Sequence, residues 1–158
     1  MIIKGIISED FINYKKTSMT IEFPYCNFKC DKECGKPVCQ NSKLVNLENI
    51  EVPVETLISF YLKNDLTQAI VLQGLEPMDS KEDVYQLINY LRRYSDDDIV
   101  IYTGYTEEEL KSEIQLMQDK YNNIIIKFGR FIPDQPSHFD EVLGIKLASP
   151  NQYAKKIC

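Results

Sequence analysis

The chain has 158 residues, of which 44% are hydrophobic and 27% charged, proportions typical of one globular domain with a single core. Its net charge of −6 argues against nucleic-acid binding, because phosphate contacts need clustered lysine and arginine. No apolar run reaches the ~18 residues of a membrane span, and the apolar part of the N-terminus is too short for a signal peptide, so we expect a cytoplasmic protein with no membrane segment.

The first part of the chain predicts two strands that lead to a cysteine-rich loop. Residues 1–16 are expected to form an edge strand and a lead-in loop. Apolar and polar residues alternate over 17–25, a period of two that predicts a strand, and Pro24 ends it. The loop that follows therefore leaves the carboxyl end of a strand, where sites form in α/β folds.

The middle of the chain alternates between helix and strand patterns. An apolar stripe predicts a helix from about Pro53 to Lys63, and the continuous apolar run 69–73 is typical of a strand buried on both faces. Ser80 is expected to cap the next helix, which ends near Tyr94. A third strand is predicted over 98–102.

The last third of the chain continues the same alternation. Thr106 and Glu109 form a capping-box pattern at the start of a helix. A fourth strand is predicted over 123–127, followed by a proline-containing loop and a short strand near 142–147. This order calls for a mainly parallel sheet with right-handed crossovers. A full eight-fold barrel needs about 250 residues. The prediction is therefore an α/β fold, an incomplete parallel β/α barrel in a single domain spanning 1–158.

Four of the five cysteines lie within Pro24–Ser42, at Cys26, Cys30, Cys34 and Cys39. The odd number and the short-range clustering favour metal binding over disulfides. Four thiolates complete an iron–sulfur cubane, and three leave one iron with an exchangeable position. Gaps of three, three and four residues between these cysteines also fit a structural zinc site. The cysteines alone leave iron–sulfur and zinc equally open.

Short motifs recur in one order along the chain: CNFKC with a later CQN, LQGLEPMD, IYTGYT, FGRF and LASPNQ. This set resembles the radical S-adenosylmethionine (SAM) superfamily. More narrowly, it is similar to the activating proteins of anaerobic (class III) ribonucleotide reductases, over about Ser18 to Gln152. The resemblance implies the partial barrel of that superfamily.

The resemblance also implies the cluster ligands. The family has three cysteines, spaced three and then two residues apart, and Cys26 and Cys30 match the first two. Its third cysteine is commonly followed by an aromatic residue and Asn, a pattern that Cys39 with Asn41 fits in part, so we assign the third ligand to Cys39. Cys34 is nearer the usual spacing and remains the alternative; otherwise it is a spare thiol, or a ligand before the cofactor arrives.

Four further residues are implied as cofactor contacts. Gly74 and Glu76 resemble the family's Gly-Gly-Glu-Pro segment, which contacts the amino group of SAM, with Leu75 replacing the second glycine. Glu76 either places negative charge near that ammonium or holds the loop. Thr103, after the third strand, and Asn151, in the segment similar to the family's Ser-Asn-Gln, are the other two.

Several other reactive side chains have simpler interpretations. We expect Lys127 to be a solvated basic residue, His138 a surface residue in a loop, and Cys158 a free surface thiol. Arg130 is a candidate for orienting a carboxylate or a partner loop.

The implied function is reductive cleavage of SAM at a [4Fe–4S] cluster to a 5′-deoxyadenosyl radical, with an electron from a flavodoxin- or ferredoxin-like carrier. The implied target is a backbone glycine of a partner, the anaerobic ribonucleotide reductase. One alternative is a radical SAM enzyme acting on another protein or a small molecule. A second alternative is a non-catalytic, zinc-stabilised binding module.

Overall fold

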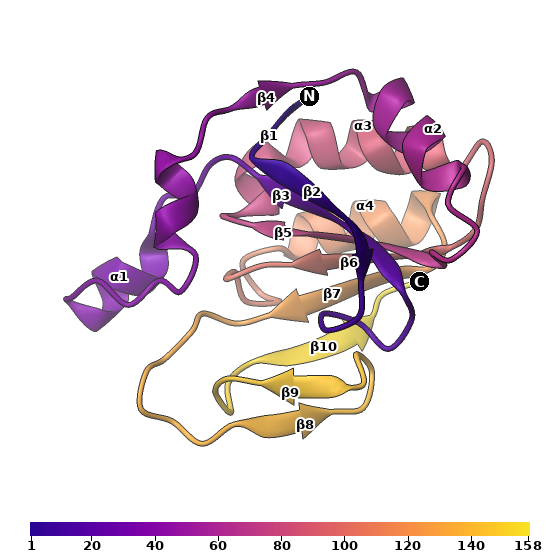
Figure 1. Cartoon of the computed structure of the whole chain (residues 1–158). Coiled ribbons are helices and arrows are strands. Elements are labelled where there is room, and N and C mark those ends of the chain that lie inside the picture. The colour runs from indigo at the N-terminus through magenta and orange to yellow at the C-terminus, as the bar shows by residue number, and fades with distance from the viewer.

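Figure 1 shows the chain as a computed structural model that describes all 158 residues. Its centre is a six-stranded sheet in the order β10-β7-β6-β5-β3-β2. The inner strands pair in parallel, and the two edge strands run antiparallel to their neighbours. The strands are β2 (Gly5–Asp10), β3 (Ser18–Phe23), β5 (Ala69–Gly74), β6 (Asp98–Tyr102), β7 (Ile124–Phe128) and β10 (Tyr153–Lys156).

Three helices pack on one face of this sheet: α2 (Val54–Leu62), α3 (Lys81–Leu91) and α4 (Lys111–Lys120). Leu57, Leu87 and Met117 from these helices join Met19 and Ile70 from the sheet in one buried cluster. The helices bury apolar stripes with the spacing that the sequence predicts. None of the helices is both long and apolar enough to cross a bilayer.

The opposite face is covered without helices. Tyr14, from the loop after β2, and Leu143 pack there with Val71 and Val100 of the sheet. Leu143 lies in the turn of a hairpin formed by β8 (His138–Asp140) and β9 (Ile145–Leu147). The predicted fold class is confirmed: a mostly parallel α/β sheet with interleaved helices, consistent with a partial β/α barrel.

Short elements surround the carboxyl ends of the parallel strands. They are β1 (Ile2–Ile3) paired with β4 (Ile50–Glu51), helix α1 (Lys29–Cys34), and the 3₁₀ helices η1 (Ser42–Asn46) and η2 (Pro77–Ser80). Figure 1 shows α1 projecting from the side of the sheet where β6 and β7 end.

Helix starts were predicted with mixed success. The capping box is present: the Thr106 amide donates to Glu109 Oε2 at 2.9 Å, and the Glu109 amide donates to Thr106 Oγ1 at 3.3 Å, although regular helix begins only at Lys111. The cap expected at Ser80 is wrong. Ser80 stands at the N-cap position of α3, but its hydroxyl caps nothing and is buried without a partner.

The end of the chain differs from expectation. The short strand near 142–147 is half of the β8–β9 hairpin, and a further strand, β10, pairs with β7. Only Ala154 of β10 is buried and both of its lysines are exposed, which is why the sequence there looked like a charged end. His138 begins β8 and is half-buried, with its Nδ1 enclosed and unpartnered, so its assignment to a surface loop is wrong.

Candidate metal centre

The carboxyl ends of β3, β5, β6 and β7 form one edge of the sheet, as expected for parallel neighbours. Phe23 pairs with Gly74, and Tyr102 pairs with Lys127. The residues predicted from the strand-end motifs therefore reach a common region, and each can be placed by its contacts.

Gly74 ends β5 with a backbone that only glycine adopts readily. Its φ is +99°, and a Cβ there would lie 2.7 Å from the amide nitrogen of Phe23. The Gly74 carbonyl accepts a hydrogen bond from Asn41 Nδ2 at 2.7 Å. This bond joins the end of β5 to the residue that lies two positions after Cys39.

Glu76 is buried in the turn after β5, with 5% of its surface exposed. Its Oε1 accepts from the Met78 amide at 3.0 Å, and its Oε2 accepts from the Gly104 amide at 2.8 Å. Thr103 is also buried beside this turn, and its hydroxyl oxygen accepts from the Tyr105 amide at 3.0 Å. Burial raises the pKa of Glu76 to about 7, although these hydrogen bonds oppose that shift. Of the two roles expected for Glu76, holding the loop is the one these contacts perform.

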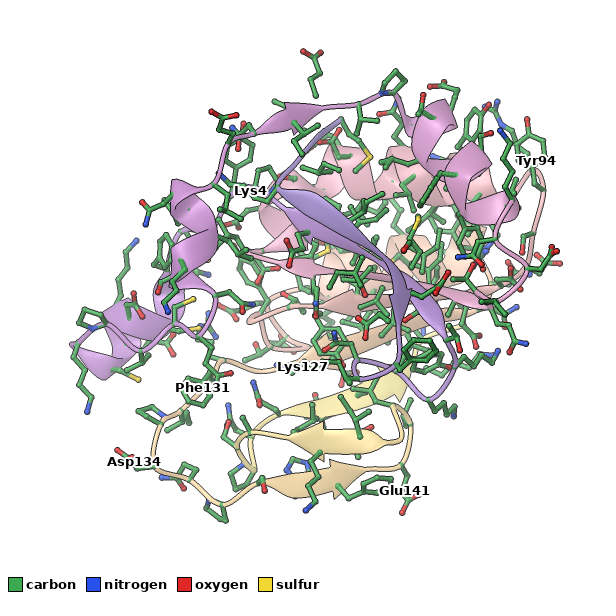
Figure 2. The ribbon with its side chains drawn as sticks, viewed as in Figure 1. Lys4, Tyr94, Lys127, Phe131, Asp134 and Glu141 are labelled. Carbon is green, nitrogen blue, oxygen red and sulfur yellow. The ribbon has the colours of Figure 1, made fainter.

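Lys127, at the end of β7, is 7% exposed, so the expectation of a solvated residue is wrong. Every residue of β7 is buried, which leaves its ammonium donating to the Gly129 carbonyl at 2.9 Å. Burial lowers the pKa of Lys127 to about 8, while the charges of Glu76 and Cys30 act in the opposite direction. Figure 2 shows Lys127 against the sheet and Phe131 further along the same segment, towards α1.

The cysteine segment folds around α1. Cys30 and Cys34 lie on this helix, Cys26 precedes it and Cys39 follows it, and all four are half-buried free thiols. Asp31 Oδ1 accepts from the amides of Val38, at 2.8 Å, and of Cys39, at 2.9 Å. The side chain of Asp31 thus folds the enlarged loop back, so that Cys39 returns to the start of the helix.

The thiols differ in their electrostatic surroundings. Burial raises the pKa of Cys26 to about 11 and also raises the pKa of Cys30 and of Cys39. The charge of Cys39 contributes to the raised pKa of Cys26 and of Cys30. No three cysteine, histidine or carboxylate side chains converge on a single point in this structure. A bound metal would lower these pKa values, because coordination deprotonates thiols.

A hydrogen-bonded network anchors the first half of the cysteine loop. Asp79 Oδ2 accepts from the Asn27 amide at 2.9 Å, and Asp79 Oδ1 accepts from the Tyr105 hydroxyl at 2.6 Å. Asn27 Nδ2 in turn donates to that hydroxyl at 2.9 Å and to Asp79 Oδ1 at 3.3 Å. The sequence analysis missed this role, although Asn27 and Asp79 both lie inside the motifs CNFKC and LQGLEPMD.

Arg130 connects α1 to the turn after β7. It forms ion pairs with Glu109, at 2.6 Å, and with Glu33 of α1, at 3.1 Å. The hydrogen bond from Arg130 lowers the pKa of Glu109 to about 2. Lys29 also pairs with Glu109, at 3.0 Å. Arg130 therefore orients carboxylates, and those that it contacts belong to this chain.

A cavity of about 400 Å³ lies between α1 and the turn after β7. Its lining includes Cys30, Cys34 and Asn151, together with the aromatic rings of Phe128 and Phe131. Asn151 Nδ2 donates to the Arg130 carbonyl at 2.8 Å, so it also braces the cavity wall. Asn151, predicted as a cofactor contact, thus shares a cavity with a predicted cluster ligand.

Comparison with known families agrees with the thiol chemistry. Residues 17–146 match the model of a 4Fe-4S single cluster domain, which spans most of the chain. The chain therefore belongs to the 4Fe-4S single cluster domain family. Domains of this kind are typical of radical SAM enzymes. The comparison with curated proteins finds no match, and the comparison with solved structures finds none.

Proposed function

We propose that this protein is a radical SAM enzyme that reductively cleaves S-adenosylmethionine at a [4Fe–4S] cluster. The observation that best supports this proposal is that the cysteine segment lies at the carboxyl edge of the sheet. There it meets the Gly74–Glu76 turn through the bond between Asn41 and Gly74. Family membership and this placement speak against a zinc-stabilised binding module.

The residues present fit such a cluster, because thiolates are its usual ligands. Cys26, Cys30 and Cys39 would hold it. Support for Cys39 comes from Asp31, which accepts a hydrogen bond from its amide, and from Asn41, which joins the segment of Cys39 to the end of β5.

When bound, the cluster supplies the electron that splits the sulfonium of SAM into methionine and a 5′-deoxyadenosyl radical. The residues of the chain would bind the cofactor and shield it from water. Gly74, which has no side chain, lets β3 and β5 approach closely at the strand ends and so sets the position of the turn that contains Glu76. The Glu76 carboxylate holds the turn after β5 in place through the amides of Met78 and Gly104. Phe128 and Phe131 give the cavity apolar walls that exclude water.

The finer proposal is that the radical is passed to a backbone glycine of an anaerobic ribonucleotide reductase. The electron would come from a flavodoxin- or ferredoxin-like carrier. Support comes from the ordered motifs and from the small partial barrel, whose open side suits a protein substrate. Reconstituted, reduced protein mixed with that reductase and SAM should produce a glycyl radical signal in EPR. If SAM is cleaved but no such signal forms, the target is another protein or a small molecule.

A further inference from the structure

Cys34 is the one thiol of the cysteine segment that the proposed ligand set leaves unused. It ends α1, four residues after Cys30. Residues four apart lie on the same face of a helix, one turn from each other. Both cysteines line the cavity of about 400 Å³. The space in front of the proposed ligand Cys30 is therefore also the space in front of Cys34.

A guanidinium lines the same cavity as these thiols. Arg130 lines the same cavity and is 9% exposed. Its buried Nε forms no hydrogen bond, because Glu33 lies 3.1 Å away but is not aligned to accept one. A guanidinium beside a thiol stabilises the thiolate. The cavity thus holds a buried guanidinium that is paired with Glu33 and Glu109 and whose charge also acts on Cys30.

The two cysteines that compete for the third ligand position are held differently. Cys39 lies in a segment that is joined to the sheet, because Asn41, two residues later, donates to the Gly74 carbonyl at 2.7 Å. Cys34 ends a six-residue helix with no buried residue, and Gly35 follows it with φ of +66° and open space around its Cβ position. Cys34 therefore ends a helix that contributes nothing to the core, whereas the segment of Cys39 is tied to β5.

From these observations we infer that Cys34 is an exchangeable fourth ligand, which binds the open iron in the resting protein and is displaced by SAM. The inference rests on the proposed function. In the exchange, the bond between iron and Cys34 Sγ breaks, and the amino nitrogen and a carboxylate oxygen of SAM bind that iron. The released thiolate takes up the proton that the α-ammonium group of SAM loses when its nitrogen binds iron, and no electrons are transferred.

The first test needs no SAM and is therefore independent of SAM cleavage. Wild type, Cys34→Ala and the control Cys158→Ala are loaded anaerobically and treated with ferricyanide. A cluster held by three cysteines loses its open iron, leaving a three-iron cluster that EPR detects. We expect Cys34→Ala to form several-fold more of this species than wild type and Cys158→Ala. Equal amounts in all three would overturn the inference, and so would failure of Cys34→Ala to hold any cluster.

The second test uses the unaltered protein. Cluster-loaded wild type is treated with iodoacetamide, with and without SAM and without reductant, and alkylation of each cysteine is followed by mass spectrometry. Cys34 should be protected in the absence of SAM and alkylated several-fold faster in its presence, while Cys158 reacts at one rate in both. If Cys34 reacts equally in both conditions, although spectroscopy shows SAM bound to the cluster, it is no exchangeable ligand. If the ferricyanide result holds but reduced protein leaves SAM intact, the proposed function fails and the ligand role of Cys34 stands.

Discussion

Asn41 Nδ2 donates a 2.7 Å hydrogen bond to the carbonyl of Gly74, across a sequence separation of 33 residues. The two residues belong to different motifs, one at the end of the cysteine segment and one at the end of β5. The bond holds the proposed third ligand, Cys39, beside the turn that contains Glu76. The bond gives a physical reason why an asparagine two residues after a cysteine helps to identify that cysteine as the third ligand.

Replacing Asn41 by Ala should loosen the cysteine loop. The lost hydrogen bond should reduce the free energy of unfolding by about 1 kcal/mol, since net hydrogen-bond contributions are of that size. The cluster should suffer more, because its third ligand loses its tether. We expect less iron and sulfide bound per chain after anaerobic reconstitution. Asn122→Ala is a matched control, because Asn122 makes an exposed hydrogen bond to Asp96 far from the site. Equal loading of both variants would contradict the tethering role.

Gly74 and Gly35 both have a positive φ, so replacing each by alanine distinguishes the cost of backbone strain from the cost of a steric clash. Gly74→Ala forces both a strained φ and a Cβ at 2.7 Å from the Phe23 amide nitrogen, a backbone atom that cannot yield cheaply. Gly35→Ala imposes only the strain, since no atom lies within 4 Å of its Cβ position. We expect a loss of about 1 kcal/mol for Gly35→Ala and clearly more for Gly74→Ala, measured by urea unfolding. Similar losses would show that β3 and β5 do not approach as closely as described.

Asp79 should be a positioning residue for the loop that carries Cys26 and Cys30. Asp79→Ala removes acceptors from the Asn27 amide and from the Tyr105 hydroxyl. We expect a destabilisation of about 2 kcal/mol and faster hydrogen exchange at the Asn27 amide. Asp79→Asn should be milder, because its one amide oxygen can still accept from Tyr105. As a control, Asp119→Ala removes only an exposed bond within α4. An unchanged exchange rate at Asn27 in Asp79→Ala would contradict the role.

Buried Glu76 should make stability depend on pH. Its pKa rises from 4.5 to about 7 on folding, so between these values the folded state binds more protons than the unfolded state. Stability should therefore fall as pH rises from about 4.5 to about 7, by about 2–3 kcal/mol for this group. Urea unfolding of metal-free wild type and Glu76→Gln across this range measures the slope. The variant should lack this component of the decline, whatever its absolute stability. Parallel slopes for the two proteins would show that Glu76 does not titrate here.

Elements with a clear hydrophobic periodicity could be predicted from the sequence, and the structure explains why other features could not. Helix α2 buries Val54, Leu57, Ile58 and Tyr61 as expected, because a helix with one apolar stripe packs on a sheet with that stripe against the sheet. Lys127 was misjudged because its burial depends on β10, a strand that pairs with β7 but lies far from it in the sequence. The strand β10 was itself hidden by exposed lysines.

The site was predictable in its residue types and less so in its contacts. The cysteines and the Gly74–Glu76 turn follow from local motifs. The network of Asn27, Asp79 and Tyr105 joins three separate segments, so no local pattern reveals it. Likewise, Lys4 donates to the carbonyls of Val45 and Leu47, and so supports the chain after the cysteines from a position more than 40 residues earlier in the sequence.

The most direct test of the account is whether the reduced, cluster-loaded protein cleaves S-adenosylmethionine. Methionine and 5′-deoxyadenosine are measured by chromatography after dithionite reduction of wild type, Cys39→Ala and Cys34→Ala. The account predicts both products from wild type and from Cys34→Ala, and neither from Cys39→Ala. A wild-type protein that holds a fully reduced [4Fe–4S] cluster and leaves S-adenosylmethionine intact would contradict it.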